Sequence, residues 1–168
     1  MAASATVREE MAQQEKPAEP TIESGAPVVS AAEIEIDAPI ERVWAVLTDV
    51  EAWPGWNPDV RSASLRGPFE EGATFRWKAG PGTITSRVEH VDRPRRLSWS
   101  GRTLGIRALH VWRLDERDGG TLVRTEESYE GLVARALRRM LQKTLDAALA
   151  DGARSLKTEA ERSAPSSP

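Results

Sequence analysis

The chain has 168 residues, of which 39% are hydrophobic and 29% charged, and its formal net charge at pH 7 is −3. These values are typical of a single soluble domain, and no apolar run approaches the roughly 20 residues needed to span a bilayer. The absence of cysteine excludes a disulfide framework, a thiolate nucleophile and a cysteine-based metal site. The charge balance has no nucleic-acid signature. The first 24 residues lack the features of a secretory signal, so we expect a cytoplasmic protein.

Both ends of the chain are poor in large apolar side chains. Residues 1–28 mix Ala with Glu, Gln and Pro, and residues 163–168 contain only Ser, Ala and Pro. Such segments bury too little apolar surface to offset the entropy lost on ordering. The sequence therefore predicts flexible tails at 1–28 and 163–168 around one folded domain at 29–162.

The domain begins with a strand and a short helix. Alternating apolar and acidic residues around 34–37 predict a strand over 31–37, and Pro39 followed by helically spaced apolar residues predicts a helix over 39–48. The run Trp53-Pro54-Gly55-Trp56-Asn57-Pro58 follows. Because proline fixes its own backbone and restricts the residue before it, we expect this run to form a rigid, non-helical aromatic corner.

Strands and one long helix are expected in the remainder of the domain. The predicted strands cover 60–66, 73–79, 83–91, 96–101, 105–116 and 120–129. Gly80-Pro81-Gly82 is typical of a hairpin turn, and the conflicting positions of Val88 and Val91 indicate a bulge. A helix is predicted over 131–161. Its expected buried stripe consists of Leu137, Leu141, Leu145, Ala148 and Gly152, widened by Met140, Leu149 and Leu156.

Asp118-Gly119 is a strong signal for a tight hairpin, and it sets the register of the last two strands. The predicted pairs are Arg117 with Gly120, Leu114 with Val123, Trp112 with Thr125, His110 with Glu127, and Ala108 with Tyr129. Side chains alternate across a strand, so these residues share the buried face. The opposite face, which we expect to be exposed to solvent, carries Arg113, Asp115, Arg124 and Glu126. An imidazole and a carboxylate are therefore expected side by side on the buried face.

Several segments together resemble one known superfamily. They are Glu35-Ile36-Asp37-Ala38-Pro39, Val43-Trp44, Trp56-Asn57-Pro58, Val91-Asp92-Arg93-Pro94-Arg95-Arg96-Leu97 and the terminal helix. Over about residues 30 to 160 the chain resembles the START-like (SRPBCC) superfamily, most closely its polyketide cyclase/dehydrase-like branch. The resemblance implies an α+β helix-grip fold, in which a bent antiparallel β-sheet wraps around a long C-terminal helix. A short helical segment follows the first strand, and a ligand cavity lies between helix and sheet.

The chain contains six tryptophans but only two phenylalanines and one tyrosine. Because a buried indole N–H needs a hydrogen-bond acceptor, tryptophans tend to line sites that are apolar but still offer some polar groups or water. Plain core packing is the competing interpretation for each of them. Together with the resemblance, this composition predicts a tryptophan-lined cavity. The candidate ligand-binding residues are Trp44, Trp56, Phe75, Trp77, Trp99, His110, Trp112, Thr125, Glu127, Tyr129, Leu137, Leu141 and Leu145.

His110 and Glu127 are the candidate catalytic residues, because a buried carboxylate needs a partner and the register supplies this imidazole. The pair could transfer protons, orient the polar end of a ligand, or make only a structural hydrogen bond that Thr125 shares. With two histidines and no cysteine, no metal is expected. The glycine-rich nucleotide motifs are absent, so no cofactor is expected either.

Three classes of function remain open. The first is binding of a small hydrophobic molecule, such as a lipid, a polyketide or another aromatic compound, in the tryptophan-lined cavity. The second is a cyclase or dehydratase that acts on a poly-keto or aromatic substrate through His110 and Glu127. The third is a protein-interaction module that uses the aromatic corner or the basic stretch of the terminal helix. That stretch contains Arg135, Arg138, Arg139 and Lys143. An ordinary solvent-exposed helix face is the competing interpretation of these residues.

Overall fold

The computed structural model describes residues 20–22 and 25–162, so most of the predicted N-terminal tail and all of the C-terminal tail lie outside the described residues. The elements are β1 (Val28–Ile36), α2 (Ile40–Thr48), the 3-10 helix η1 (Val50–Ala52), α3 (Trp53–Trp56), β2 (Val60–Leu65), β3 (Thr74–Ala79), β4 (Gly82–Asp92), β5 (Arg96–Thr103), β6 (Ile106–Arg117), β7 (Gly120–Glu130), α4 (Leu132–Ala136) and α5 (Arg138–Arg162). Strand β1 begins at Val28, three residues before the predicted start, and Val28 is fully buried.

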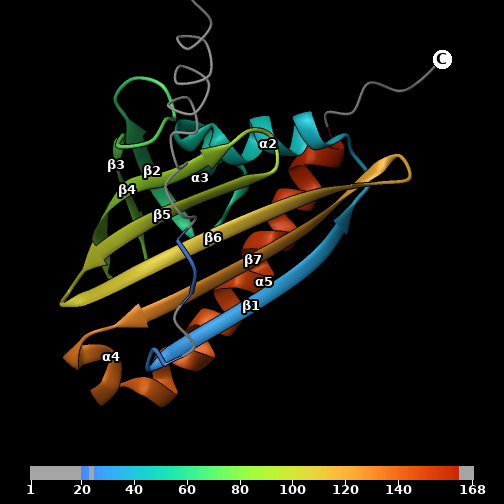
Figure 1. The fold of residues 1–168 in the computed structure, drawn as a ribbon. Coiled ribbons are helices and arrows are strands. Elements are labelled where there is room, and N and C mark those ends of the chain that lie inside the picture. The colour runs from blue at the N-terminus through green and yellow to red at the C-terminus, as the bar shows by residue number, and fades with distance from the viewer. Residues whose placement is uncertain (1–19, 23–24, 163–168) are drawn as a thin grey trace, which may run out of the picture.

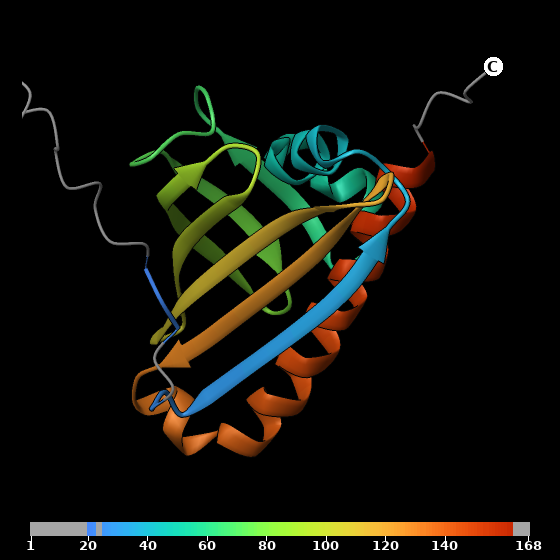
Figure 2. The same cartoon turned by 45° about the vertical axis from the view of Figure 1, so that its right-hand side comes forward.

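The strands form one antiparallel sheet in the order β1-β7-β6-β5-β4-β3-β2. The sheet bends around α5, which runs along β1. Helix α2 lies at the end of the sheet where β6 and β7 are joined, and α3 packs against β2 (Figures 1 and 2). The long helix held against a bent sheet confirms the predicted α+β helix-grip fold. This arrangement places the side chains on the concave face of β5, β6 and β7 toward the helices.

The predicted register of the last hairpin is confirmed in all five pairs, from Ala108 with Tyr129 to Arg117 with Gly120. Gly119 supplies the positive φ of +87° that the tight turn requires. The expected bulge also occurs, since the pairing of β4 with β5 shifts between Val88 and His90. The opposite face of the hairpin carries the predicted charges, with ion pairs joining Arg113 to Glu126 and Arg124 to Asp115.

The aromatic corner was predicted wrongly in one respect, because Trp53–Trp56 forms one turn of α-helix. Proline is tolerated at the first positions of a helix, where its missing N–H would have no partner in any case. Pro54 occupies such a position. The turn closes with a hydrogen bond of 2.8 Å from the Asn57 amide to the Trp53 carbonyl. A second bond of 3.0 Å runs from Trp53 Nε1 to the Leu47 carbonyl and fixes the corner to the end of α2.

The terminal helix is also not continuous. It is interrupted at Leu137, which is 44% exposed instead of buried as predicted. The break lets α4 pack near β6 and β7 while α5 follows β1 (Figure 1). No proline or glycine marks this position in the sequence, so the interruption is a consequence of tertiary packing.

The buried stripe of α5 consists of Leu145, Leu149, Ala153, Leu156 and Ala160. Leu145, Leu149 and Leu156 were predicted, and the centre of the stripe is rotated toward the last two of these. Ala148, expected in the stripe, is exposed. Polar side chains on one flank of α5 hold it to β1: Gln142 donates to the Val29 carbonyl at 2.7 Å, and Lys157 donates to the Glu35 carbonyl at 2.7 Å. These bonds fix how the helix is rotated about its axis.

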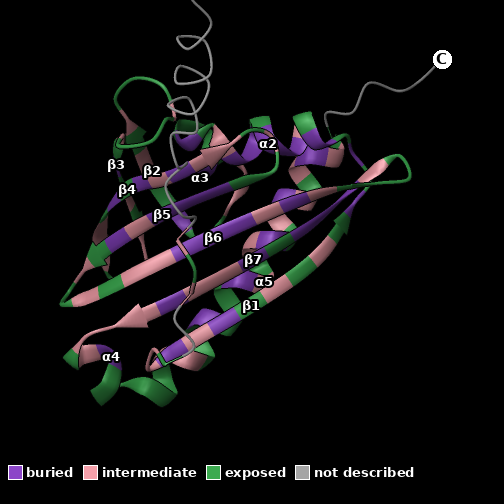
Figure 3. Ribbon diagram, in the orientation of Figure 1, coloured by how far each residue is buried: buried purple, intermediate pink, exposed green. Residues whose placement is uncertain are grey.

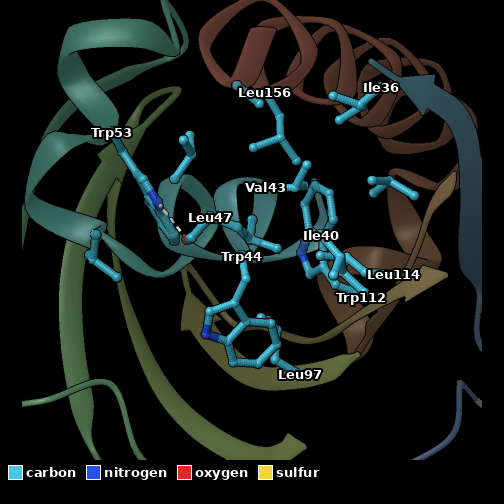
Figure 4. Close-up of a cluster of buried hydrophobic side chains, with 14 of the residues drawn as sticks. Ile36, Ile40, Val43, Trp44, Leu47, Trp53, Leu97, Trp112, Leu114 and Leu156 are labelled. Atoms are coloured by element: carbon cyan, nitrogen blue, oxygen red, sulfur yellow. Dashed lines mark hydrogen bonds between the residues drawn. The ribbon is translucent and has the colours of Figure 1, made fainter. Parts of the chain in front are cut away.

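Buried apolar residues fall into two clusters (Figure 3). The large cluster joins α2, η1, α3, the inner face of the sheet and the last turns of α5, and it contains Trp44, Trp53, Phe75, Trp99 and Trp112. Figure 4 shows Trp44 reaching from α2 toward Leu97 and Trp112 on the sheet. The small cluster, at the other end, consists of Val28, Leu145 and Leu149, with Ala32, Tyr129 and Leu141 packed against it.

Candidate functional site

Polar residues separate the two clusters on the concave face of the sheet. His110 on β6 pairs with Glu127 on β7, and Glu127 pairs in turn with Ser30 on β1. Thr125 lies two residues from Glu127 on the same face of β7. We call Ser30, His110, Thr125 and Glu127 the polar row. The hairpin register predicted from the sequence thus brings the imidazole and the carboxylate together.

The ring of His110 is held between aromatic neighbours. Its centroid lies 4.8 Å from that of Trp99 and 5.0 Å from that of Trp112. Nε2 lies 2.7 Å from the Thr125 hydroxyl, whereas Nδ1 lies 3.5 Å from Glu127 Oε2 and has no hydrogen bond. Burial disfavours the charged imidazolium and lowers the pKa of His110 to about 3. The ring is therefore neutral at physiological pH.

Glu127 is predominantly protonated at neutral pH. Burial raises its pKa to about 8, and within the described residues its one ion-pair partner is the neutral His110. Burial, and secondarily the neighbouring Glu127, raises the pKa of the Tyr129 phenol as well. At the β1 end of the row, the Ser30 hydroxyl donates to Asp146 of α5 at 2.6 Å. The centre of the row is therefore buried, polar and neutral.

Three buried ring nitrogens near this row lack a hydrogen-bond partner in the described part of the chain: Trp56 Nε1, His110 Nδ1 and Trp112 Nε1. An unpaired buried polar group costs about 1–3 kcal/mol, so native proteins rarely leave one without a reason. The N–H groups of two other indoles do have hydrogen-bond partners. Trp53 donates to a backbone carbonyl, and Trp77 donates to the Ser86 hydroxyl at 3.1 Å. Within the same described residues, Arg42 Nε and Ser98 Oγ are buried without a partner as well, but the three unsatisfied ring nitrogens all belong to residues predicted to bind ligand.

One flank of α5 carries small residues. Asp146 and Lys157 lie on the flank that reaches β1. With 100° per residue, Ala148 and Gly152 lie on the opposite flank, toward β7 and β6. A Cβ atom built on Gly152 would meet only the side-chain amide of Asn57, at 4.0 Å. Ala148 is exposed and Gly152 is half-buried, so this flank carries little side-chain bulk.

The structure distributes the thirteen candidate residues over distinct places. Trp44, Phe75, Trp99 and Trp112 are buried in the large cluster, Trp56 and Trp77 pack at its margin, His110, Thr125 and Glu127 form most of the polar row, and Leu141, Leu145 and Tyr129 belong to the small cluster. Leu137 is the exception, because its exposed side chain at the break between α4 and α5 belongs to neither cluster.

Two residues that the candidate set lacks are central to this region. Trp53 has ring centroids 5.6 Å from those of Phe75, Trp77 and Trp99, and so holds the aromatic cluster together. The sequence signal that could have identified Trp53 is its position in the same aromatic corner as Trp56. Ser30 completes the polar row, but the pairing of β1 with β7 joins residues about a hundred positions apart. No local pattern indicates such a partner.

Two surface hollows lie away from the polar row. One of about 360 Å³ adjoins Pro27, Arg107 and Arg135, and one of about 510 Å³ adjoins Arg61, Lys78 and Pro81; neither is lined by tryptophan. Across residues 20–22 and 25–162, no three His, Asp or Glu side chains gather closely enough to hold a metal ion. In the same residues, no helix is both long and apolar enough to cross a membrane.

Comparison with known proteins agrees with the fold. A hypothetical protein from Helicobacter pylori superposes with a TM-score of 0.74 at 16% identity, over 83% of this chain and 91% of that chain. The Zhui aromatase/cyclase from Streptomyces sp. R1128 gives 0.71 at 18%, over 82% and 96%. A START superfamily protein from Mycobacterium smegmatis gives 0.63 at 16%, over 80% and 97%. The sequence matches none of the curated proteins. Residues 27–161 match the profile of one family, and the chain therefore belongs to the polyketide cyclase / dehydrase and lipid transport family.

Proposed function

We propose that the protein binds a small, hydrophobic, uncharged molecule between α5 and the concave face of the sheet, with the polar row as the floor of the site. The observation that carries this proposal is the set of unpaired buried nitrogens, above all Trp112 Nε1 and His110 Nδ1. A ligand oxygen would give the Trp112 N–H the acceptor that the protein does not supply.

The chemistry of the row specifies the kind of polar group. The indole N–H is a donor only, and the protonated Glu127 carboxyl can donate as well. His110 Nδ1 accepts or donates according to its tautomer. A carbonyl or hydroxyl oxygen suits this set, whereas a charged group would be buried without a counter-ion. The apolar part of the ligand would lie against Trp99, Trp112 and the small cluster. A neutral lipid, a polyketide or an oxygenated aromatic compound fits these requirements.

Mass spectrometry tests for such a ligand. The protein is purified from its own host, measured under native conditions, and then extracted with denaturant to identify any retained small molecule. A stoichiometric hydrophobic passenger supports the proposal. If no passenger is retained and no member of a panel of neutral lipids and aromatic ketones binds the purified protein, the proposal fails.

A matched pair of variants tests the site itself. Trp112→Phe keeps a ring but removes an N–H that has no protein partner, so affinity for the identified ligand should fall about fivefold, the equivalent of one hydrogen bond. Trp77 was a candidate ligand-binding residue, but it packs at the margin of the large cluster and its N–H already bonds Ser86, so Trp77→Phe should leave affinity unchanged. Equal affinities of both variants and the wild type would place the ligand elsewhere.

A second candidate function, cyclisation or dehydration of a poly-keto substrate, is favoured by the neutral His110 and Glu127 pair, 3.5 Å apart. Neutral His110 can take a proton from a carbon next to a ketone, and protonated Glu127 can give one to the ketone oxygen. Both forms coexist between about pH 3 and about pH 8, which predicts a broad activity plateau ending on the alkaline side as Glu127 ionises.

Glu127→Gln separates catalysis from binding. The amide keeps the shape of the side chain but cannot deliver a proton, so turnover of the extracted substrate should be lost while its binding persists. Unchanged turnover in this variant would contradict the catalytic role and leave the binding function intact.

A further inference from the structure

Exposed apolar side chains gather at one end of the molecule. Within the described residues, the exposed large hydrophobic residues are Leu104 (66%), Leu132 (83%), Leu137 (44%) and Met140 (57%). Leu104 is in the turn between β5 and β6. Leu132 is in α4, Leu137 is at the break between α4 and α5, and Met140 is in the first turn of α5. The turn and α4 are adjacent, because a Cβ atom on Gly105 would lie 3.2 Å from Val133. Figures 1 and 3 show this exposed end, opposite α2.

The same end is strongly basic. Residues 131–145 contain Arg135, Arg138, Arg139 and Lys143 but no Asp or Glu, in a chain whose net charge is −3. The three arginines and Met140 are exposed, and none of the four basic side chains forms an ion pair within the described part of the chain. By contrast, Arg93 and Arg95 at the other end of the sheet pair with Glu41 and Glu116. We call Leu104 and residues 132–143 the basic end.

We propose that the basic end docks on the surface of an anionic lipid bilayer, as a peripheral contact. Unpaired arginines complement anionic headgroups, and apolar side chains interleaved with them can enter the boundary between headgroups and acyl chains. A nucleic acid would complement the charge but give no partner for Leu132, Leu137 and Met140. The basic end lies apart from the polar row, so docking does not depend on which ligand the interior binds.

The direct test is co-sedimentation of the full chain with vesicles of phosphatidylcholine containing phosphatidylglycerol, against vesicles of phosphatidylcholine alone. Binding should require the anionic lipid and weaken with added salt. Each basic residue near the surface contributes roughly fivefold in affinity, so Arg135→Gln/Arg138→Gln/Arg139→Gln should weaken binding by on the order of a hundredfold. Leu132→Ser/Leu137→Ser should weaken binding while keeping its salt dependence.

The matched control is Arg93→Gln/Arg95→Gln, which removes exposed arginines from the opposite end and should bind about as the wild type does. Circular dichroism confirms that each variant is folded, as expected for exposed positions. The proposal is overturned if anionic vesicles bind no better than neutral ones, or if the control loses as much affinity as the basic-end variant. It is also overturned if sedimentation equilibrium shows a dimer that Leu132→Ser/Leu137→Ser dissociates, because the surface would then be an interface between two copies.

Discussion

The two apolar clusters on either side of the polar row are built differently. In the large cluster, Trp53 meets Phe75 and Trp77 edge to face, with ring planes at 89° and 85°, and its N–H is bonded. The small cluster has three fully buried aliphatic residues and no buried aromatic ring. Aromatic pairs in such geometry add about 0.5–1.5 kcal/mol each beyond the area they bury. The large cluster therefore supplies more of the stability.

This difference explains where a ligand fits. The rings of Trp99 and Trp112 fix His110 from the side of the large cluster. On the other side the row is held by the hydrogen bond from Ser30 to Asp146, and the neighbouring flank of α5 carries small residues. One wall of the candidate site is thus rigid, and the other is thinly packed. We therefore expect stability to depend mainly on the large cluster, and binding to depend on the polar row and on the side of it that faces α5.

The largest expected effect is that of Trp53→Ala. The substitution removes a buried indole that touches three other rings, so it should lower the free energy of unfolding by about 3–5 kcal/mol. Urea denaturation followed by circular dichroism measures the loss. A loss under about 1 kcal/mol would mean that the large cluster does not dominate stability.

Leu145→Ala should cost less, about 2 kcal/mol, at the lower end of the range for a buried leucine. Leu145 is 1% exposed, but the small cluster around it has few members. The same urea titration gives the comparison. Equal losses from Trp53→Ala and Leu145→Ala would remove the contrast between the two ends.

Glu127→Gln should change how stability depends on pH. The pKa of Glu127 is about 8 in the fold against 4.5 ordinarily, so between these values the unfolded chain releases a proton that the folded protein retains. Wild-type stability should therefore fall from about pH 5 to about pH 8.5, and glutamine removes this contribution. Urea denaturation of the wild type and of Glu127→Gln at about pH 5 and about pH 8.5 measures how far the free energy of unfolding of each protein falls. If the two decreases are equal, burial does not raise this pKa.

The smallest expected effect is a difference between two tryptophans. Trp77→Phe leaves the Ser86 hydroxyl without its partner and should cost about 1–3 kcal/mol, whereas Trp112→Phe removes an N–H that is already unpaired and should cost about 1 kcal/mol or less. Thermal and urea unfolding of the two variants rank them. The reverse order would indicate that Trp112 has a protein partner in solution.

Local patterns in the sequence were sufficient for much of the fold. The Asp118-Gly119 turn fixed the register of β6 and β7, because a tight hairpin allows one pairing and alternation then assigns each face. The neighbouring positions of His110 and Glu127 follow from that register alone. The same local reasoning failed at Pro54, which lies in the first turn of a helix where a helix end was expected.

The sequence by itself thus determined the fold class, through a resemblance that spans the domain, and the bulge in β4 and the central pair of the polar row, which depend on residues close together in the chain. Only the tertiary structure decided the break at Leu137, the rotation of α5 and the contribution of Ser30. These features depend on contacts between distant parts of the chain: α4 with β6 and β7, β1 with β7, and α5 with β1, as in the bond of Gln142 to Val29. Periodicity identifies which side of a helix is apolar, but the partner it meets fixes which residues become buried.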